Sequence, residues 1–459
     1  MTIKRINKIQ RKFFNADLTK DISFRVRMLS KLEDEIVKRE DDILSALKKD
    51  LNKSETEAYL TEISIVLDEI KMYKKKLAKW NKRKVKISPI SHWPSSSYIY
   101  REPYGNVLVL APWNYPFQLA VLPLAGAIAG GNTVVLKPSR NSKHTSEIIR
   151  KIVRNIFDEE YVYCVDEEIS NEEILKGSYD LIFFTGSPNA AKDIMKAASK
   201  KLTPVVLELG GKSPCIVDSS ADLEVAARRL AWGKYLNAGQ TCVAPDYLLI
   251  DNRVKDKFLE LLKKYIKAMY DENPVLNKDY VHIINENRFN KLSQLIDECS
   301  INGKSIWGGM RYKEELCIEP TIINGVDWDD EIMQEEIFGP ILPVIGYDNL
   351  SKEIQKIKSR PRPLALYIFS RDKKVIKNVI NGVSFGGGCV NDVVMHVANG
   401  KLPFGGVGNS GMGVYHGKHT FETFTRPKAV EYGKNYLDVP LRYPPYTEKK
   451  LNLIRKILG

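Results

Sequence analysis

Cys242 and Glu208 are the two residues whose types and settings best support a chemical reaction. Cys242 closes the segment Gly239-Gln240-Thr241-Cys242, and Glu208 opens the segment Glu208-Leu209-Gly210-Gly211-Lys212. A thiolate is a strong nucleophile and a carboxylate can serve as its base, while the neighbouring glycines let a ligand approach the backbone. The pair therefore suggests covalent catalysis through a thioester.

The alternative for Cys242 is structural, because an unpaired cysteine usually behaves as a small buried hydrophobe. We prefer that interpretation for the other cysteines, which show no repeated spacing, no C-x-x-C pair and no histidine-rich cluster typical of zinc sites. They are Cys164, Cys215, Cys299, Cys317 and Cys389. The sequence thus predicts no metal site.

Four short apolar segments should position polar groups around this pair. Helix-length segments separate them, which is the pattern of a doubly wound parallel sheet. They cover Asn106–Ala111, Thr133–Leu136, Asp180–Thr185 and Pro204–Glu208. Ligands bind beyond the carboxyl ends of such strands, and there the chain carries Asn114, Lys137, Gly186-Ser187 and Glu208. Each alone would be ordinary turn chemistry, but together they predict a site at one edge of a sheet.

The rest of the chain indicates a second sheet. Residues 1–80 show apolar positions every three or four residues, which predicts helices, and the Ser- and Pro-rich stretch 88–97 ends this pattern. Beyond Cys242 we expect a helix and further strands, at Lys255–Met269 and at Tyr247–Asp251, Ile341–Ile345 and Ala365–Phe369. We predict an α/β protein with two doubly wound, Rossmann-like parallel-sheet domains that face each other across a cleft.

The composition argues against several classes of protein. The chain has 459 residues, six cysteines and a net charge of +13, which fits a globular protein of a reducing compartment, and we expect the cytoplasm. The N-terminal residues lack the apolar segment of a secretory signal. Basic residues are spread without a recognition motif, which argues against nucleic-acid binding. Proline and glycine interrupt the apolar stretch 117–136, so we expect a buried helix, a turn and a strand there rather than a membrane span.

A series of motifs runs in order along nearly the whole chain. They are Trp113-Asn114, Lys137-Pro138-Ser139, Phe184-Thr185-Gly186-Ser187, Glu208-Leu209-Gly210-Gly211-Lys212, Gly239-Gln240-Thr241-Cys242, Glu336-Ile337-Phe338-Gly339-Pro340 and Pro403-Phe404-Gly405-Gly406. With these motifs the chain resembles the aldehyde dehydrogenase superfamily. The segments 242–247, 390–392 and 403–413 are similar to the class 3 branch of that superfamily.

The resemblance implies a division into domains. Residues 1–84 and 104–209 would form an NAD(P)-binding domain, and residues 210–418 a catalytic domain. Residues 85–103 and 419–436 would form a small β oligomerisation arm, with a homodimer as the expected assembly. The tail, residues 437–459, contains a short amphipathic helix. This helix would dock over a partner subunit or the tunnel mouth, or make a peripheral contact with a membrane.

The resemblance also implies catalytic roles. Cys242 would attack the aldehyde carbon, and the side-chain amide of Asn114 with the backbone N–H of Cys242 would stabilise the oxyanion. After hydride transfer to the nicotinamide, Glu208 would activate the water that hydrolyses the thioester to a carboxylic acid. Substrates of the branch are medium or long aliphatic and aromatic aldehydes. Their tunnel would be lined by Tyr115, Trp232 and Phe404, although core packing is the alternative for such aromatic residues.

NAD or NADP is the cofactor that the resemblance implies. Its binding residues would be Trp113, Lys137, Ser139, Arg140, Gly186, Ser187, Glu336 and Phe338. Arg140 stands where the family usually has a glutamate for the ribose hydroxyls. Because arginine can pair with a 2′-phosphate, we hypothesise that NADP is accepted, with a solvent-facing Arg140 as the alternative. In a second departure, Ala191 replaces a glycine, and its methyl group would crowd a helix against the sheet.

Other functions fit these residues less well. A coenzyme-A-acylating enzyme of the same fold would pass the thioester to a thiol and would not need Glu208 as a base. A catalytically silent binding protein would not need a complete set of nucleophile, base and oxyanion donor. Cys-His protease chemistry would require a histidine partner for Cys242. No histidine lies near Cys242 in the sequence. The G-x-G-x-x-G fingerprint of carbonyl-reducing Rossmann enzymes is missing where the alternation begins.

Overall fold

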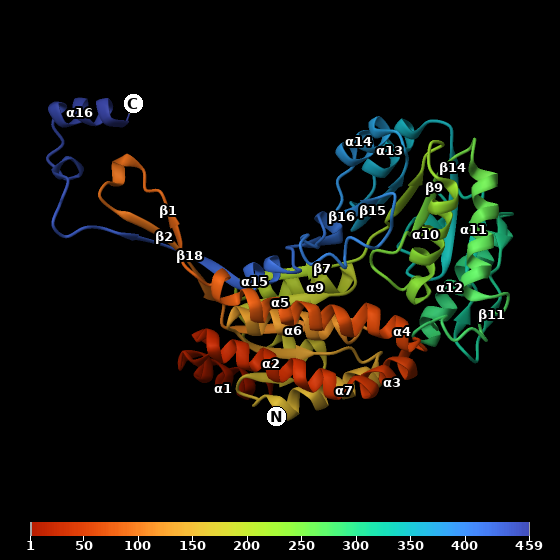
Figure 1. Cartoon of the computed structure of the whole chain (residues 1–459), viewed down its shortest axis with the longest axis horizontal. Coiled ribbons are helices and arrows are strands. Elements are labelled where there is room, and N and C mark those ends of the chain that lie inside the picture. The colour runs from red at the N-terminus through yellow and green to blue at the C-terminus, as the bar shows by residue number, and fades with distance from the viewer. Residues whose placement is uncertain (1, 459) are drawn as a thin grey trace.

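The computed structural model describes residues 2–458 and arranges them as two sheets with their helices and a projecting arm (Figure 1). The N-terminal part is helical, as predicted. Its helices are α1 (Ile3–Asn15), α2 (Ile22–Lys38), α3 (Glu40–Leu51), α4 (Glu55–Ala58) and α5 (Ser64–Trp80). A π-helical turn at Tyr59–Ile63, which the sequence did not predict, connects α4 to α5.

The first sheet has the strand order β17-β7-β6-β3-β4-β5. Its strands are β3 (Asn106–Leu110), β4 (Thr133–Lys137), β5 (Val162–Cys164), β6 (Leu181–Thr185), β7 (Val205–Glu208) and β17 (Gly411–Met412). All are parallel except β17, and the four predicted strands are confirmed to within one residue at each end. The strand order reverses between β3 and β6, so ligands are expected beyond the carboxyl ends of these two strands.

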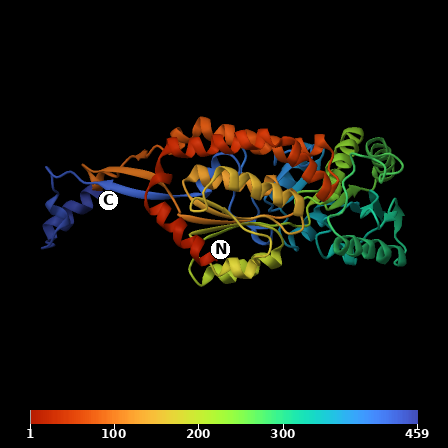
Figure 2. The same cartoon turned by 90° about the horizontal axis from the view of Figure 1, so that it is seen from below.

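Helices cover both faces of the first sheet (Figure 2). The helices that follow its strands are α6 (Gln118–Gly130), α7 (Lys143–Ile156), α8 (Asn171–Leu175) and α9 (Pro188–Ser199). Alternate residues of β3 enter different hydrophobic clusters: Val107 and Val109 pack with α2, α5 and α6, whereas Leu108 and Leu110 pack with α1 and α9. This two-residue alternation is the normal geometry of a strand buried on both faces.

The apolar stretch 117–136 forms the buried helix α6, a turn and the strand β4, as predicted. Every residue of α6 is buried, and Gly131 ends the helix in a left-handed conformation. Among the described residues, no helix combines the length and the apolar character needed to cross a membrane.

The second sheet has the strand order β10-β13-β14-β9-β8-β15-β16, in which only β10 is antiparallel. Its strands are β8 (Pro214–Val217), β9 (Tyr247–Asp251), β10 (Ser305–Trp307), β13 (Thr321–Asn324), β14 (Ile341–Tyr347), β15 (Ala365–Phe369) and β16 (Gly387–Val390). A separate pair consists of β11 (Arg311–Tyr312) and β12 (Cys317–Ile318). The helices of this half are α10 (Leu223–Tyr235), α11 (Lys255–Tyr270), α12 (Glu286–Ile301), α13 (Leu350–Lys358) and α14 (Lys373–Gly382). The predicted α/β class with two Rossmann-like sheets is therefore confirmed.

The arm is a three-stranded antiparallel sheet that projects from the body (Figure 1). It contains β1 (Lys84–Lys86), β2 (Ser96–Pro103) and β18 (Thr425–Tyr432), and β18 follows helix α15 (Lys418–Thr423). The tail beyond β18 ends in α16 (Glu448–Leu458). The domain boundaries remain a prediction. Strand β17 lies within residues 210–418, yet it pairs with β7 of the first sheet.

Asn132 connects three segments at the base of the arm. The residue is fully buried, and its Oδ1 accepts a hydrogen bond from the N–H of Gly105 at 3.0 Å. Its Nδ2 donates to the carbonyl oxygens of Ala127 at 3.1 Å and Phe424 at 2.9 Å. Asn132 thus ties the approach to β3 and the end of α6 to the residue that precedes β18.

The substitution Asn132→Ala should destabilise the protein by roughly 2–4 kcal/mol, because each buried polar group left without a partner costs about 1–3 kcal/mol. The measurement is the urea midpoint followed by circular dichroism. Asn290→Ala is the matched control, because Asn290 is exposed on α12. An Asn132→Ala midpoint equal to that of the control would contradict this role.

Candidate active site

Two cavities meet at Cys242. The first has a volume of about 510 Å³ and the second of about 580 Å³. Both are lined by Thr185, Glu208, Leu209 and Cys242. A thiol at this junction can be approached by one molecule from each side, and the carboxylate of Glu208 borders the same two spaces.

The first cavity is predominantly apolar. All three predicted tunnel residues, Tyr115, Trp232 and Phe404, line it. Its other apolar lining residues include Leu60, Ile65, Leu119, Leu236, Met269, Val394 and Val397. Such a lining favours an uncharged molecule with a substantial hydrocarbon part.

A tight turn ahead of Cys242 presents the thiol to the cavities. Asn237 and Ala238 both have left-handed φ angles, of 54° and 50°. Gly239 has a φ of 71°, and a Cβ atom there would lie 2.2 Å from the carbonyl oxygen of Gly339. Only glycine fits that position, which explains why the motif before Cys242 begins with glycine.

Asn114 is buried in the loop that follows β3 and makes contact with this turn. Its Nδ2 donates to the carbonyl oxygen of Gln240 at 3.1 Å. Its own carbonyl oxygen accepts a hydrogen bond from Nδ2 of Asn237 at 2.9 Å. Asn114 and Cys242 also line the second cavity together. The amide has two N–H groups, so it can donate to Gln240 and to an oxyanion formed beside Cys242.

Glu208 ends β7 and is almost completely buried. Neither of its carboxyl oxygens has a hydrogen-bond partner within the described part of the chain. Burial raises the pKa of Glu208 well above its usual value, because a carboxylate loses its hydration there. An unpaired carboxyl group beside a thiol is free to interact with a water or a ligand in the cavity.

Burial also raises the pKa of the Cys242 thiol, to about 12, with smaller contributions from the charges of Glu336 and Glu208. The thiol is therefore overwhelmingly protonated at neutral pH in the protein without ligands. A positive charge in the second cavity would act in the opposite direction and favour the thiolate.

The second cavity brings together five of the predicted cofactor residues. They are Trp113, Gly186, Ser187, Glu336 and Phe338. The rings of Trp113 and Phe338 are in edge contact, with centroids 5.4 Å apart. Pro188 and Asn189, the first residues of α9, line the cavity as well. A helix N-terminus attracts anions, so this space fits the pyrophosphate of a dinucleotide.

Lys137, Ser139 and Arg140 are not among the lining residues of either cavity. Lys137 is the last residue of β4, which pairs with β3 in the sheet, and Ser139 and Arg140 follow that strand. Lys137 is buried, and burial lowers its pKa together with the charges of Arg140 and Arg150. Arg140 is exposed and donates from Nη2 to the carbonyl oxygen of Glu168 at 3.2 Å. The cationic side chains of Lys137, Arg140 and Arg150 make this end of β4 electropositive.

Asp246 is a residue of this site that the motifs contained but did not single out. It is buried, its Oδ1 accepts from the N–H of Ile337 at 2.9 Å, and its Oδ2 pairs with Lys212 at 2.6 Å. It thereby fixes the loop that carries Glu336, whose pKa is raised to about 8 by burial and by the charge of Asp246. The sequence feature that could have identified Asp246 is its position four residues after Cys242.

Gly210 and Ala191 are two small residues that pack closely against their surroundings. A Cβ atom at Gly210 would lie 1.9 Å from Oε2 of Glu336, so glycine is needed for the carboxyl group to occupy its position. Ala191, the departure from the family pattern, is buried in α9 within the cluster that covers the first sheet. Among residues 2–458 there is no group of three histidine, cysteine or acidic side chains that could hold a metal ion.

The rate at which iodoacetamide alkylates Cys242 should rise about tenfold per pH unit between pH 7 and 9 in the protein without ligands. The reason is that the reactive thiolate fraction grows in this proportion below a pKa of about 12. Peptide mass spectrometry measures the rate, with the fully buried Cys215 as the internal control. A rate independent of pH in this range would show that Cys242 is already a thiolate.

Comparisons with known proteins place the chain in a family. Residues 3–430 match the model of the aldehyde dehydrogenase family. The chain is 47% identical to the 4,4'-diaponeurosporen-aldehyde dehydrogenase of Staphylococcus aureus, over 95% of each chain, and 43% identical to the dimeric NADP-preferring aldehyde dehydrogenase of Rattus norvegicus, over 98% of each. A structure described as the substrate-bound state of Staphylococcus aureus AldH superimposes with a TM-score of 0.97 at 44% identity, and the match covers 100% of both chains. The chain belongs to the aldehyde dehydrogenase family and is an oxidoreductase that acts on aldehydes.

Proposed function

We propose that this enzyme oxidises medium- or long-chain aliphatic or aromatic aldehydes to carboxylic acids, with Cys242, Asn114 and Glu208 as its catalytic residues. The observation that carries the proposal is the junction of two different cavities at Cys242. An apolar aldehyde can reach the thiol from one side, and a dinucleotide fits the other.

The first step is addition of Cys242 to the carbonyl carbon as the thiolate, the form that a positive charge in the second cavity favours and that has already lost the thiol proton to solvent. The aldehyde oxygen becomes an oxyanion, which accepts hydrogen bonds from Nδ2 of Asn114 and from the backbone N–H of Cys242. Preorganised donors of this kind stabilise the transition state without reorganisation of solvent. Trp113, Glu336 and Phe338 of the second cavity would hold the nicotinamide of NAD(P)⁺, which would supply the acceptor for the hydride of this carbon. The product of these events is a thioester on Cys242.

Glu208 acts in the second half of the reaction. Its carboxylate takes a proton from a water molecule while the water oxygen attacks the thioester carbon. The Cys242 sulfur then leaves as the thiolate, and the carboxylic acid is released. Because the pKa of Glu208 is raised, its ionised form is a stronger base than an ordinary carboxylate, and hydrolysis should slow as the pH falls.

The substitution Glu208→Gln should lower the steady-state rate by roughly 10²- to 10⁴-fold, the usual contribution of a general base. NAD(P)H should still form in a rapid first turnover, and mass spectrometry should detect an acyl group on Cys242. Cys242→Ala is the control that removes both signals. A Glu208→Gln enzyme with full turnover would contradict the assignment of the base.

The same assays test the coenzyme-A-acylating alternative. If water hydrolyses the thioester, the natural protein should release free acid without coenzyme A. A product that forms only with coenzyme A, as an acyl thioester, would favour the alternative.

The family uses NAD(P), and we propose that this chain accepts NADP as well as NAD. The support is the electropositive end of β4, where Lys137, Arg140 and Arg150 lie close enough for their charges to affect one another. The rat relative is named NADP-preferring. An arginine can pair with the 2′-phosphate that distinguishes NADP from NAD.

Arg140→Ala should reduce kcat/KM for NADP by about tenfold, because an exposed charge-assisted contact contributes on the order of 1–2 kcal/mol. The value for NAD should change by less than about twofold. Steady-state kinetics with both cofactors measures this ratio, and Lys151→Ala, on an exposed face of α7, is the control. An equal loss with both cofactors would show that Arg140 does not contact the 2′-phosphate.

We also propose a homodimer and a cytoplasmic location. The support for the dimer is the arm of β1, β2 and β18, which projects from the body (Figure 1), and the word dimeric in the name of the rat relative. Apolar side chains are exposed on the arm and its connecting loop, at Val85, Ile87, Ile90, Trp93 and Tyr432. A second subunit would cover such a surface.

A further inference from the structure

Lys53 and Glu62 form a buried ion pair that belongs to neither cavity. Their side chains are 0% exposed, and Nζ of Lys53 lies 2.5 Å from Oε1 of Glu62. Two charges are costly to bury, and an apolar pair of similar size often stabilises a protein as well or better. We therefore infer the role of this ion pair from the backbone groups that Lys53 and Glu62 bind.

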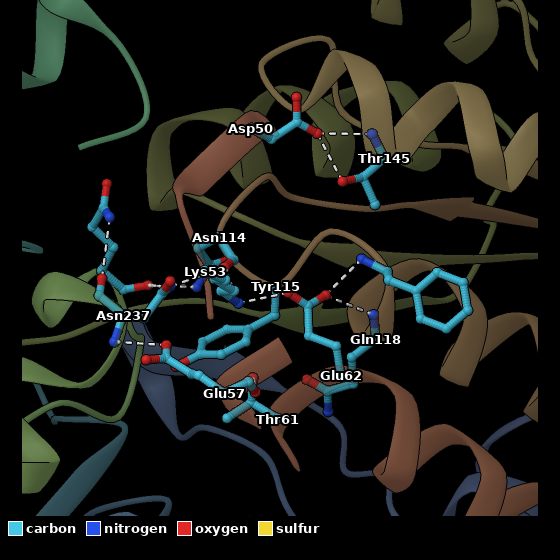
Figure 3. Close-up of polar contacts among 12 residues, drawn as sticks. Asp50, Lys53, Glu57, Thr61, Glu62, Asn114, Tyr115, Gln118, Thr145 and Asn237 are labelled. Carbon is cyan, nitrogen blue, oxygen red and sulfur yellow. Dashed lines mark hydrogen bonds and ion pairs between the residues drawn. The ribbon is translucent and has the colours of Figure 1, made fainter. Parts of the chain in front are cut away.

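Glu62 holds the beginning of α6. Its Oε2 accepts hydrogen bonds from the N–H groups of Phe117 at 2.8 Å and Gln118 at 3.2 Å (Figure 3). Helix α6 has no side-chain cap of its own at this end, so a carboxylate from another segment satisfies its first donors. Glu62 lies in the π-helical turn Tyr59–Ile63, a type of irregularity that often occurs at functional sites.

Lys53 holds the preceding residues. Its Nζ donates to the carbonyl oxygen of Asn114 at 3.4 Å and lies 4.0 Å from the ring centre of Tyr115 (Figure 3). An ammonium group has three donors and no acceptor, so it can serve the carboxylate of Glu62 and this carbonyl at the same time. The segment 114–118 is thus fixed at its start by Lys53 and at its end by Glu62.

The carbonyl of Asn114 is also the point where the turn before Cys242 is attached, through Nδ2 of Asn237 at 2.9 Å. The backbone N–H of Asn237 in turn donates to Oε1 of Glu57 at 3.1 Å, and Glu57 lies four residues after Lys53 in the chain. A single short segment, residues 53–62, therefore contacts both loops that supply oxyanion donors.

We propose that the Lys53–Glu62 ion pair positions the oxyanion hole by fixing the backbone of Asn114, so that the Asn114 amide meets the oxyanion formed at Cys242. The inference rests on the proposed function. Lys53 and Glu62 are positioning residues, since neither lines a cavity. The oxyanion develops in the transition state. Removal of the ion pair should therefore lower kcat more than it changes KM.

The experiment compares the natural protein with Lys53→Met/Glu62→Gln, a paired substitution that removes both charges and leaves no lone buried ion. Glutamine keeps an oxygen for the N–H groups at the start of α6. We expect the first-turnover rate of NAD(P)H formation to fall roughly tenfold to a hundredfold, with KM for aldehyde and cofactor within about twofold, because misplaced oxyanion donors weaken the transition state alone.

Asp50→Asn is the matched control. Asp50 caps α7 much as Glu62 caps α6, accepting from the N–H groups of His144 at 3.1 Å and Thr145 at 2.7 Å. Figure 3 shows the contact with Thr145. In the part of the chain that the structure describes, Asp50 makes no hydrogen bond with Asn114. We expect Asp50→Asn to lower the melting temperature and to leave the first-turnover rate unchanged. An equal loss of rate in this control would mean that any loosened helix cap slows the enzyme, and it would overturn the proposal.

A double-mutant cycle with Asn114→Ala separates positioning from general stability. If the ion pair acts through the Asn114 amide, the Lys53→Met/Glu62→Gln substitution should lower the first-turnover rate by less than about twofold in the Asn114→Ala background. A further tenfold loss in that background, or no loss in the natural one, would overturn the positioning role. Aldehyde oxidation by the natural protein, abolished by Cys242→Ala, is the separate requirement of the proposed function.

Discussion

The site depends on the hydrogen-bonded contact between the loop after β3 and the turn before Cys242. Nδ2 of Asn114 donates to the carbonyl of Gln240, and Nδ2 of Asn237 donates to the carbonyl of Asn114. Gln240 is held in turn by Ile284 and His282 of the second half. This contact crosses from one sheet to the other, so Asn114 and the turn before Cys242 are held together even though they come from different parts of the chain.

Burial gives the site its chemical character. Glu208 and Cys242 both lie where water is scarce, and both have raised pKa values for that reason. In such surroundings a charge brought by a ligand has a large effect, because little solvent screens it. A positive charge in the second cavity would therefore favour the Cys242 thiolate more strongly here than in bulk water.

The fold explains how one chain keeps two cavities separate. The cofactor cavity lies beyond the strands of the first sheet, near the reversal between β3 and β6. The apolar cavity is built from helical residues such as Leu60, Leu119 and Trp232, together with loop residues before β17. Only the ends of β6 and β7 and the Cys242 loop reach both. Cys242 and Glu208 thus lie at the boundary between the two cavities.

The sequence by itself determined the strands and the class of fold, and it pointed to the residues for which we propose catalytic roles. Strands such as Thr133–Lys137 are short apolar runs buried on both faces, and their hydrophobicity is a local signal. The motifs around Glu208 and Cys242 were visible because glycine is required where Gly210 packs against Glu336 and Gly239 packs against Gly339. The tertiary structure decided what has no local signal. The ion pair of Lys53 with Glu62 and the link from Asp246 to Ile337 join residues distant from their targets in the chain. The sequence alone predicts that a charged residue such as Glu62 is exposed to solvent. Only the tertiary packing determines that its side chain is buried and which groups it binds.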